Sequence, residues 1–267
     1  MRPSSGVIGV DGTDLYYETG GSGPPVVLLH GGWLHLRQWD EQAEALFADH
    51  FVVRYDVRGY GRTPLGDRPY RHNEDLAALL HALGVDAAHF VALSMGSEVA
   101  LDHALTNPGA VRSLFIGAHP MPGYDLGPTF NEPFRAIARA GAAGDKALLR
   151  RLLWDFPPLR VAGGIPEVRR RLERMFVNEY TWAHVRSDVP PRLPVEPLAS
   201  GRLHEIVPPT AVVVGNGEMD VLLGQADYML ARIPGSRKLV VEGAGHIVNM
   251  ERPETYTELL LRWLQEH

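Results

Sequence analysis

Short apolar runs alternate along this chain with longer segments that have helical periodicity. Residues 71–83 illustrate the helical pattern, because their leucines recur at spacings of three and four residues and share one face. The predicted strands are the ranges 15–18, 26–29, 51–55, 89–93, 111–116, 211–214 and 238–241. The predicted helices are 36–49, 71–83, 95–106 and 221–232, with a last helix after Pro253. This alternation predicts an α/β fold with a mostly parallel sheet and helices on both faces.

The alternation breaks between residues 119 and 200, where no clear strand pattern occurs. Helical patterns there cover 131–142, 145–154 and 166–182, and a proline-rich stretch leads back to the next strand. We therefore expect a core domain of residues 1–118 and 201–267, with a helical cap of residues 119–200 inserted into it. Parallel sheets of this kind bind their ligands at the carboxyl ends of the strands.

Composition and charge narrow the class of protein. The 267 residues are 45% hydrophobic and 22% charged, with a formal net charge of −6 and no cysteine. The acidic balance argues against a nucleic-acid partner, and the lack of cysteine excludes disulfides and a cysteine nucleophile. The start has no signal-like apolar stretch, and no window approaches the roughly 18 apolar residues of a membrane span. We expect a soluble, cytoplasmic protein with no membrane partner.

One serine stands where a predicted strand turns directly into a predicted helix, in the stretch FVALSMGSEVA. A residue at such a turn exposes its side chain at the top of the sheet, and it needs small neighbours two positions away on each side. Ala92 and Gly96 meet that need around Ser94. The alternative is a helix-capping serine, since serine favours helix starts. We interpret Ser94 as a candidate nucleophile.

A serine hydroxyl needs a base, and the base needs an orienting group. His246 follows the strand 238–241 in a glycine-containing loop. This loop should lie at the same edge of the sheet as Ser94. Asp220 follows the strand 211–214 and is the candidate acid, with Glu218 as a competitor two residues earlier. The chain order Ser, Asp, His matches the triad order of one architecture.

The developing oxyanion of an acyl transfer needs backbone N–H donors. The amide of Met95, directly after the candidate nucleophile, is one expected donor. The second is expected in the stretch HGGW after the strand 26–29, with Gly32 as first choice and Trp33 as second. Taken alone, HGG is equally typical of a plain glycine turn.

Together these segments resemble the α/β-hydrolase superfamily over nearly the whole chain. The resemblance rests on LLHGGW, DVRGYGRT, LSMGS, GNGEMD and GAGHIVNMERPE, in that order. It implies an eight-stranded sheet with the cap inserted after the sixth strand. Residues 56–83 and 243–254 look closest to bacterial members described as 3-oxoadipate enol-lactonase-like or carboxylesterase-like, which implies an ester or lactone substrate.

Substrate contacts are expected from the cap and from residues that flank the catalytic loops. The candidates are Trp33, His119, Met121, Trp154, Tyr180, Val221 and Ile247. Large apolar side chains of the cap are more often packing than cavity lining, so most of them need not touch the substrate. The arginine run at 169–171 is more typical of a solvated helix face than of an anion site.

The sequence therefore predicts a cofactor-independent serine hydrolase that acts on a small, fairly apolar ester or lactone. No metal site is expected, because no group of ligand residues has credible spacing. Carbon–carbon bond hydrolysis, acyl transfer or lyase chemistry on the same triad is the alternative, and a ligand-binding receptor is a further one. The expected partner is a small-molecule substrate, and the expected state is a monomer or small homo-oligomer.

Overall fold

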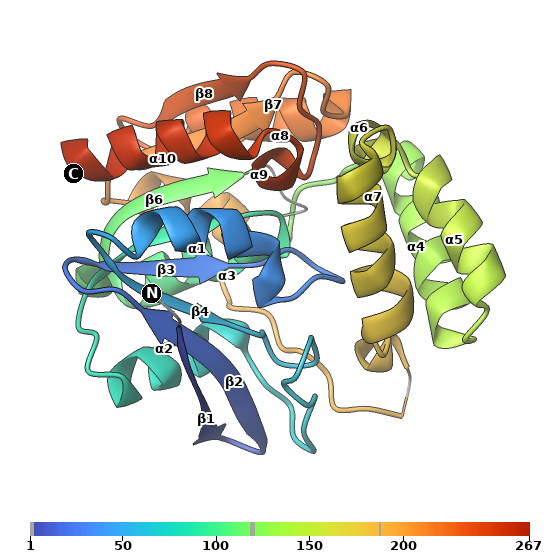
Figure 1. Cartoon of the computed structure of the whole chain (residues 1–267), viewed down its shortest axis with the longest axis horizontal. Coiled ribbons are helices and arrows are strands. Elements are labelled where there is room, and N and C mark those ends of the chain that lie inside the picture. The colour runs from blue at the N-terminus through green and yellow to red at the C-terminus, as the bar shows by residue number, and fades with distance from the viewer. Residues whose placement is uncertain (1–2, 118–120, 187) are drawn as a thin grey trace.

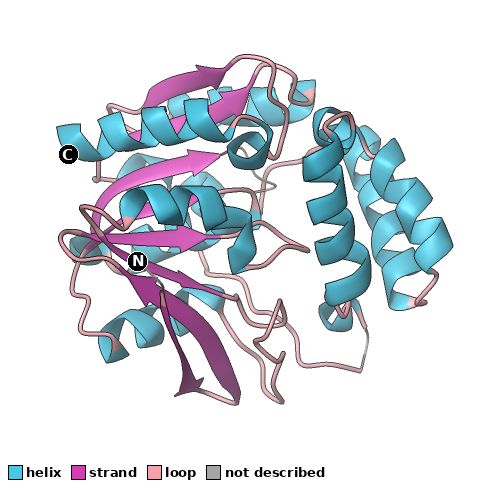
Figure 2. Ribbon diagram, viewed as in Figure 1, coloured by secondary structure: helices cyan, strands magenta, loops and turns pink. Residues whose placement is uncertain are grey.

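An eight-stranded sheet forms the centre of the computed structural model, which describes residues 3–117, 121–186 and 188–267 (Figure 1, Figure 2). The strand order is β1-β2-β4-β3-β5-β6-β7-β8. β2 pairs antiparallel with β1 and β4, and the remaining pairs are parallel, which confirms the predicted sheet. The strands are Ser4–Val10 (β1), Thr13–Gly20 (β2), Pro25–Leu29 (β3), Phe51–Tyr55 (β4), Ala88–Ala92 (β5), Val111–Gly117 (β6), Thr210–Gly215 (β7) and Arg237–Val241 (β8).

Helices cover both faces of this sheet (Figure 1). α1 and α10 pack against each other on one face, and α2 and α3 do so on the other. Burial of both faces explains why the central strands are runs of valine and leucine rather than alternating patterns. The helices of the core are Asp40–Leu46 (α1), His72–Ala82 (α2), Met95–Thr106 (α3), Asp220–Leu230 (α8), Val248–Glu251 (α9) and Pro253–Glu266 (α10).

The first strand was not apparent from the sequence. β1 is an edge strand with the sequence SSGVIGV, and its residues are exposed or half-buried throughout. Serine and glycine give it a weak strand pattern, because they contribute little side chain to pack on the sheet. β2 is likewise longer than the predicted 15–18, since pairing with β1 extends it to Thr13–Gly20.

Four helices stand together beyond the carboxyl ends of the parallel strands (Figure 1). They are Pro128–Ala142 (α4), Lys146–Asp155 (α5), Arg160–Gly163 (α6) and Pro166–Glu173 (α7), with a π-helical segment at Arg174–Glu179 after α7. All of them lie between β6 and β7, and residues 121–186 and 188–209 contribute no strand to the sheet. We call this helical group the cap.

None of the helices that the structure describes combines the length and the apolar character that a bilayer crossing requires.

Candidate active site

Ser94 occupies a strained turn between β5 and α3. Its backbone has φ 52° and ψ −126°, in a region that non-glycine residues rarely adopt. The strand and the helix leave no room for a side chain at Gly96, where a Cβ would lie 2.2 Å from the carbonyl oxygen of Leu29. Strain and close approach at this turn are features of a nucleophile held at the top of the sheet. They are not features of an ordinary capping serine, and the Ser94 side chain makes no cap hydrogen bond.

The structure corrects the expected acid. His246 is buried, and its Nδ1 lies 2.6 Å from Oε2 of Glu218, which is buried as well. Asp220 instead is exposed and begins α8. The carboxylate that faces His246 therefore belongs to Glu218, two residues before the expected Asp220.

Close packing of two loops explains why Glu218 takes this place. The N–H of Gly217 donates to the carbonyl oxygen of Ala244 at 2.8 Å, which joins the loop after β7 to the loop after β8. At Gly215 a Cβ would lie 2.2 Å from the same carbonyl, so the two backbones touch there. Glu218 is still within this turn, whereas Asp220 has already entered the helix.

The pKa of His246 reflects competition between burial and charge. Burial lowers it, but the charge of Glu218, the hydrogen bond to Glu218 and the charge of Glu251 act in the opposite direction, and the net effect is a raised pKa. The hydrogen bond to the carboxylate requires a proton on Nδ1, which leaves Nε2 as the basic nitrogen of the neutral ring. A histidine held in this tautomer is suited to accept a proton from a hydroxyl.

Glu251 is a functional candidate that the sequence reasoning missed. Its carboxylate accepts hydrogen bonds from the N–H of Gly245 and, at 3.2 Å, from that of Ile247, so it holds the backbone on both sides of His246. Burial raises the pKa of this carboxyl, and the two backbone hydrogen bonds and His246 lower it in part. In the sequence, Glu251 is simply a carboxylate five residues after the candidate base. That spacing does not reveal that its side chain folds back onto the backbone around His246.

Backbone donors of the expected oxyanion site are free. Among the described residues, the N–H groups of Gly32, Trp33 and Met95 have no hydrogen-bond partner. Trp33 has φ 63°, a left-handed conformation that turns the chain sharply after β3. Both loops border one cavity, together with Ser94. Unpaired N–H groups beside a hydroxyl are what stabilisation of a tetrahedral oxyanion requires.

His30, in the same loop, has a structural role. Its Nδ1 lies 2.8 Å from the carbonyl oxygen of Gly31, and its Nε2 accepts from the N–H of Val57 at 2.9 Å. These partners require the neutral ring with a proton on Nδ1. Burial lowers the pKa of His30 to about 3, in agreement with a neutral side chain.

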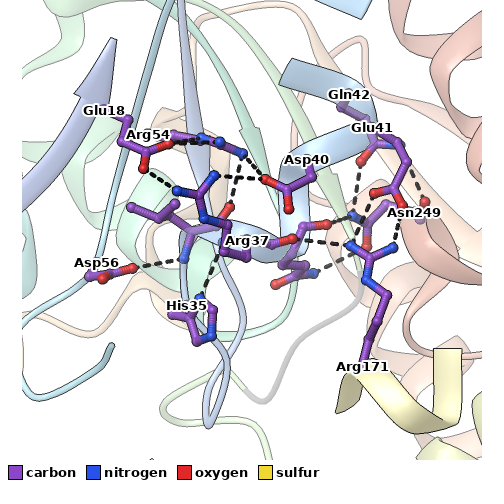
Figure 3. A network of polar contacts seen from close by, with 12 residues as sticks. Glu18, His35, Arg37, Asp40, Glu41, Gln42, Arg54, Asp56, Arg171 and Asn249 are labelled. Carbon is purple, nitrogen blue, oxygen red and sulfur yellow. Dashed lines mark hydrogen bonds and ion pairs between the residues drawn. The ribbon is translucent and has the colours of Figure 1, made fainter. Parts of the chain in front are cut away.

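A buried amide network connects the oxyanion loop to the histidine loop, and Figure 3 shows its contact between Gln42 and Asn249. Oε1 of Gln38 accepts from the N–H of Gly31 at 2.8 Å, and its Nε2 donates to Oδ1 of Asn249 at 3.1 Å. Asn249 donates in turn to the carbonyl oxygen of Gln38 at 2.9 Å and to Gln42 at 3.1 Å. Because Asn249 lies in α9, three residues after His246, the network fixes both loops relative to each other.

The cap is attached to the core by charged contacts and by aromatic packing. Arg171 of α7 forms an ion pair with Glu41 of α1 and donates to the carbonyl oxygen of Arg37 at 3.1 Å (Figure 3). Trp33 of the oxyanion loop is the aromatic centre, since four rings from the cap and from the loops that join its elements or follow it pack around it. They are Phe134 at 4.7 Å, Trp182 at 5.3 Å, Phe176 at 6.0 Å and Phe156 at 6.3 Å between ring centroids.

A cavity of about 310 Å³ lies between cap and core. Ser94 and His246 both border it, although the structure has no hydrogen bond between the two side chains among its described contacts. Such hydrogen bonds often shorten only when substrate binds. The remaining walls are mostly apolar and come from both sides, with Leu34, Phe130, Phe134, Phe156, Leu159 and Phe176 among them.

Only some of the residues predicted to contact the substrate border this cavity. Trp33 and Ile247 border it, whereas Met121, Trp154, Tyr180 and Val221 do not. Trp154 lies under the Arg169 guanidinium, 4.4 Å from ring to charge, and Tyr180 stacks on Tyr60 with centroids 5.0 Å apart. His119 falls outside the described residues. Glu98 and Arg192 also border the cavity, and no pattern in the sequence predicted either of them there.

Metal ligands are not grouped in the described part of the chain. No cluster of three or more histidine, aspartate or glutamate side chains there has a geometry that could hold an ion.

Comparison with known proteins places the chain in a family. Residues 26–259 match the alpha/beta hydrolase family, and the chain belongs to it. RutD from Azorhizobium caulinodans, to which carbamate hydrolysis is ascribed, is 29% identical and aligns over 95% of this chain and 96% of its own. Rhodomycin D methylesterase DauP from a Streptomyces species is also 29% identical, over 83% of this chain and 84% of its own.

A solved structure shares the architecture as well. The enol-lactonase from Burkholderia xenovorans superimposes with a TM-score of 0.80 over 97% of this chain and 100% of its own, at 20% identity, which bears on the fold alone. The family and its relatives make this chain a hydrolytic enzyme of the α/β-hydrolase type.

Proposed function

We propose that this chain is a cofactor-independent serine hydrolase that cleaves a small, fairly apolar carboxylic ester or lactone. The observation that carries the proposal is the strained Ser94 at the edge of the same cavity as His246, whose Nδ1 faces the buried carboxylate of Glu218 at 2.6 Å. A methylesterase among the relatives supports ester chemistry. The apolar walls of the cavity support an apolar substrate body.

The proposed reaction proceeds through an acyl-enzyme. His246 Nε2 takes the hydroxyl proton as Ser94 Oγ attacks the substrate carbonyl, and Glu218 stabilises the imidazolium that forms. The carbonyl oxygen becomes an oxyanion that accepts hydrogen bonds from the N–H of Met95 and from that of Gly32 or Trp33. When the carbon–oxygen bond breaks, His246 returns the proton to the leaving alkoxide. In a lactone the resulting alcohol remains attached to the acyl chain.

Deacylation repeats the same steps with water as the nucleophile. His246 removes a proton from the attacking water, the second tetrahedral intermediate collapses, and Ser94 regains its proton as the carboxylic acid leaves. Every proton moves through His246, so the rate depends on the neutral ring with its proton on Nδ1.

A fluorophosphonate probe tests this proposal directly. We expect one covalent adduct in the intact mass of the protein and none in Ser94→Ala. His246→Ala should label far more slowly, because the hydroxyl then lacks its base. If the folded protein formed no adduct, or if Ser94→Ala were labelled equally, Ser94 would not be an activated nucleophile and the proposal would fail.

A further inference from the structure

The apolar cavity has one charged feature that the proposed chemistry does not use. Glu98 and Arg192 form an ion pair, and both residues border the cavity. Glu98 lies in the first turns of α3, four residues after Ser94. A helix rises about 1.5 Å per residue, so its backbone lies about 6 Å along α3 from the candidate nucleophile. The pair is therefore within one substrate length of the reacting serine.

Arg192 reaches this position from the chain that returns from the cap to the core. That segment is fixed by its own backbone, because the N–H of Leu193 donates to the carbonyl oxygen of Tyr70 at 2.8 Å and the N–H of Tyr70 donates to that of Pro191 at 3.3 Å. These two hydrogen bonds hold the segment against Tyr70 without involving the Arg192 side chain. The side chain of Arg192 keeps 31% of its surface exposed and that of Glu98 keeps 8%, and both residues border the cavity.

The charges that line this end of the cavity are those of the ion pair. Burial raises the pKa of Glu98, and the charge of Arg192 and the hydrogen bond from it lower the pKa again in part. His184, which also borders the cavity, is neutral at physiological pH, because burial and then Arg192 lower its pKa to about 4. One cation and one anion thus face the cavity side by side.

A pair in which Glu98 is buried and Arg192 is partly exposed is poorly explained by stability alone. Removing two charges from water costs about as much as their attraction returns, and well-packed apolar residues are often equally stable. The walls around the pair are already apolar and aromatic, so such residues would fit their surroundings. What the pair offers instead is a guanidinium donor and a carboxylate acceptor at fixed positions.

We propose that Glu98 and Arg192 form a recognition site for the substrate, and that the natural ester or lactone carries a neutral group with both a hydrogen-bond donor and an acceptor, of the carboxamide type, several bonds from the scissile carbonyl. The carbonyl of that group accepts from Arg192, and its N–H donates to Glu98. This inference rests on the proposed function, since it assigns substrate to the same cavity.

Charged substrate ends are disfavoured by the same pair. A carboxylate near Arg192 also faces Glu98, and an ammonium near Glu98 also faces Arg192, so each meets a like charge at close range. An alkyl end leaves both side chains without a new partner. Only a group that donates and accepts satisfies both.

Three esters with acyl chains of the same length test whether the enzyme prefers a carboxamide end. The para-nitrophenyl esters of hexanoic acid, of the monoamide of adipic acid and of adipic acid differ only in an alkyl, a carboxamide or a carboxylate end. Hydrogen bonds to charged groups contribute about 1.5–3 kcal/mol, which corresponds to roughly 10- to 150-fold. We expect kcat/KM of the wild type for the carboxamide ester to exceed that for the other two by about tenfold or more.

Glu98→Gln is the informative variant, because it keeps the shape and removes the anion. We expect kcat/KM for the carboxylate ester to rise about tenfold relative to that for the hexanoate, since Arg192 then lacks its counter-charge. Glu205→Gln is the matched control. It removes the carboxylate of another arginine–glutamate pair, with Arg202, which is outside the cavity lining, and it should leave the ranking of the three esters unchanged.

The double variant Glu98→Leu with Arg192→Met covers the case in which Glu98→Gln does not fold. It should hydrolyse the hexanoate and lose the preference for the carboxamide. If either variant changed all three esters by the same factor, or if the wild type did not prefer the carboxamide, the recognition site would be refuted while ester hydrolysis stood. Failure of the whole proposed function would look different, with no turnover of any ester and no fluorophosphonate adduct on Ser94.

Discussion

Replacing Glu218 by glutamine is the sharpest test of the site geometry. The carboxylate lies 2.6 Å from His246 Nδ1, and both side chains are at least nine-tenths buried, so water cannot replace it. Glutamine has nearly the same shape, but its amide favours the wrong tautomer of the ring and cannot stabilise an imidazolium. The corresponding acid-to-amide change in a serine hydrolase costs about 10⁴-fold in kcat, which corresponds to about 5.5 kcal/mol of transition-state stabilisation.

Asp220→Asn is the matched control, because it makes the same kind of change two residues away on an exposed side chain. We expect its kcat for a short-chain para-nitrophenyl ester to stay within about twofold of the wild type, because Asp220 is exposed and does not border the cavity. Thermal denaturation checks that both variants are folded. A folded Glu218→Gln enzyme with a tenth or more of wild-type kcat would refute the assignment, and so would a hundredfold loss in Asp220→Asn.

The pH dependence gives a second readout of the same pair. His246 must be neutral to act as a base, and its raised pKa places the acid limb of kcat/KM above the usual histidine value of about 6.5. Without the carboxylate of Glu218, the lowering effect of burial on the pKa of His246 is less opposed. The acid limb of the residual activity of Glu218→Gln should therefore lie at lower pH. The pair also stabilises the fold fully below about pH 6.5, and this contribution is lost as pH rises through the raised pKa. The variant should therefore lose more stability at pH 6 than at pH 9.

Three further predictions concern the turn, a buried acid and the cap. Gly96→Ala should destabilise the protein by about 3 kcal/mol or more in thermal denaturation, because the added Cβ would overlap the carbonyl oxygen of Leu29. Gly109→Ala is the control and should be nearly neutral, because a Cβ added there would have no atom within 4 Å. Burial and then a neighbouring glutamate raise the pKa of Asp102 to about 7. The folded protein therefore keeps this proton better than the unfolded chain does, and stability falls as pH rises from about 4 through 7. For this reason Asp102→Asn should raise Tm more at pH 8 than at pH 5. Arg171→Met breaks the ion pair between α7 and α1 and should raise KM with little change in kcat, unlike Arg170→Met, which removes an exposed pair within α7.

The local chemistry of the turn around Ser94 could be predicted from the sequence because it depends on near neighbours. An apolar run, a serine between small residues and a helical pattern are all contiguous, and the structure begins α3 at Met95 as predicted. The same holds for the histidine loop, where glycines surround His246 directly after a strand. Periodicity likewise predicted most helices to within a few residues, since each one buries one face on the sheet.

Only the tertiary structure decided which acid faces His246 and which residues border the cavity. Glu218 and Asp220 are both acidic and two residues apart, and the choice depends on how the loop after β7 packs against Ala244, which is distant in sequence. The meeting of Glu98 with Arg192 depends on the path by which the chain returns from the cap. Spacing along the chain determines local conformation, but a contact between distant segments depends on how the whole sheet and cap pack together.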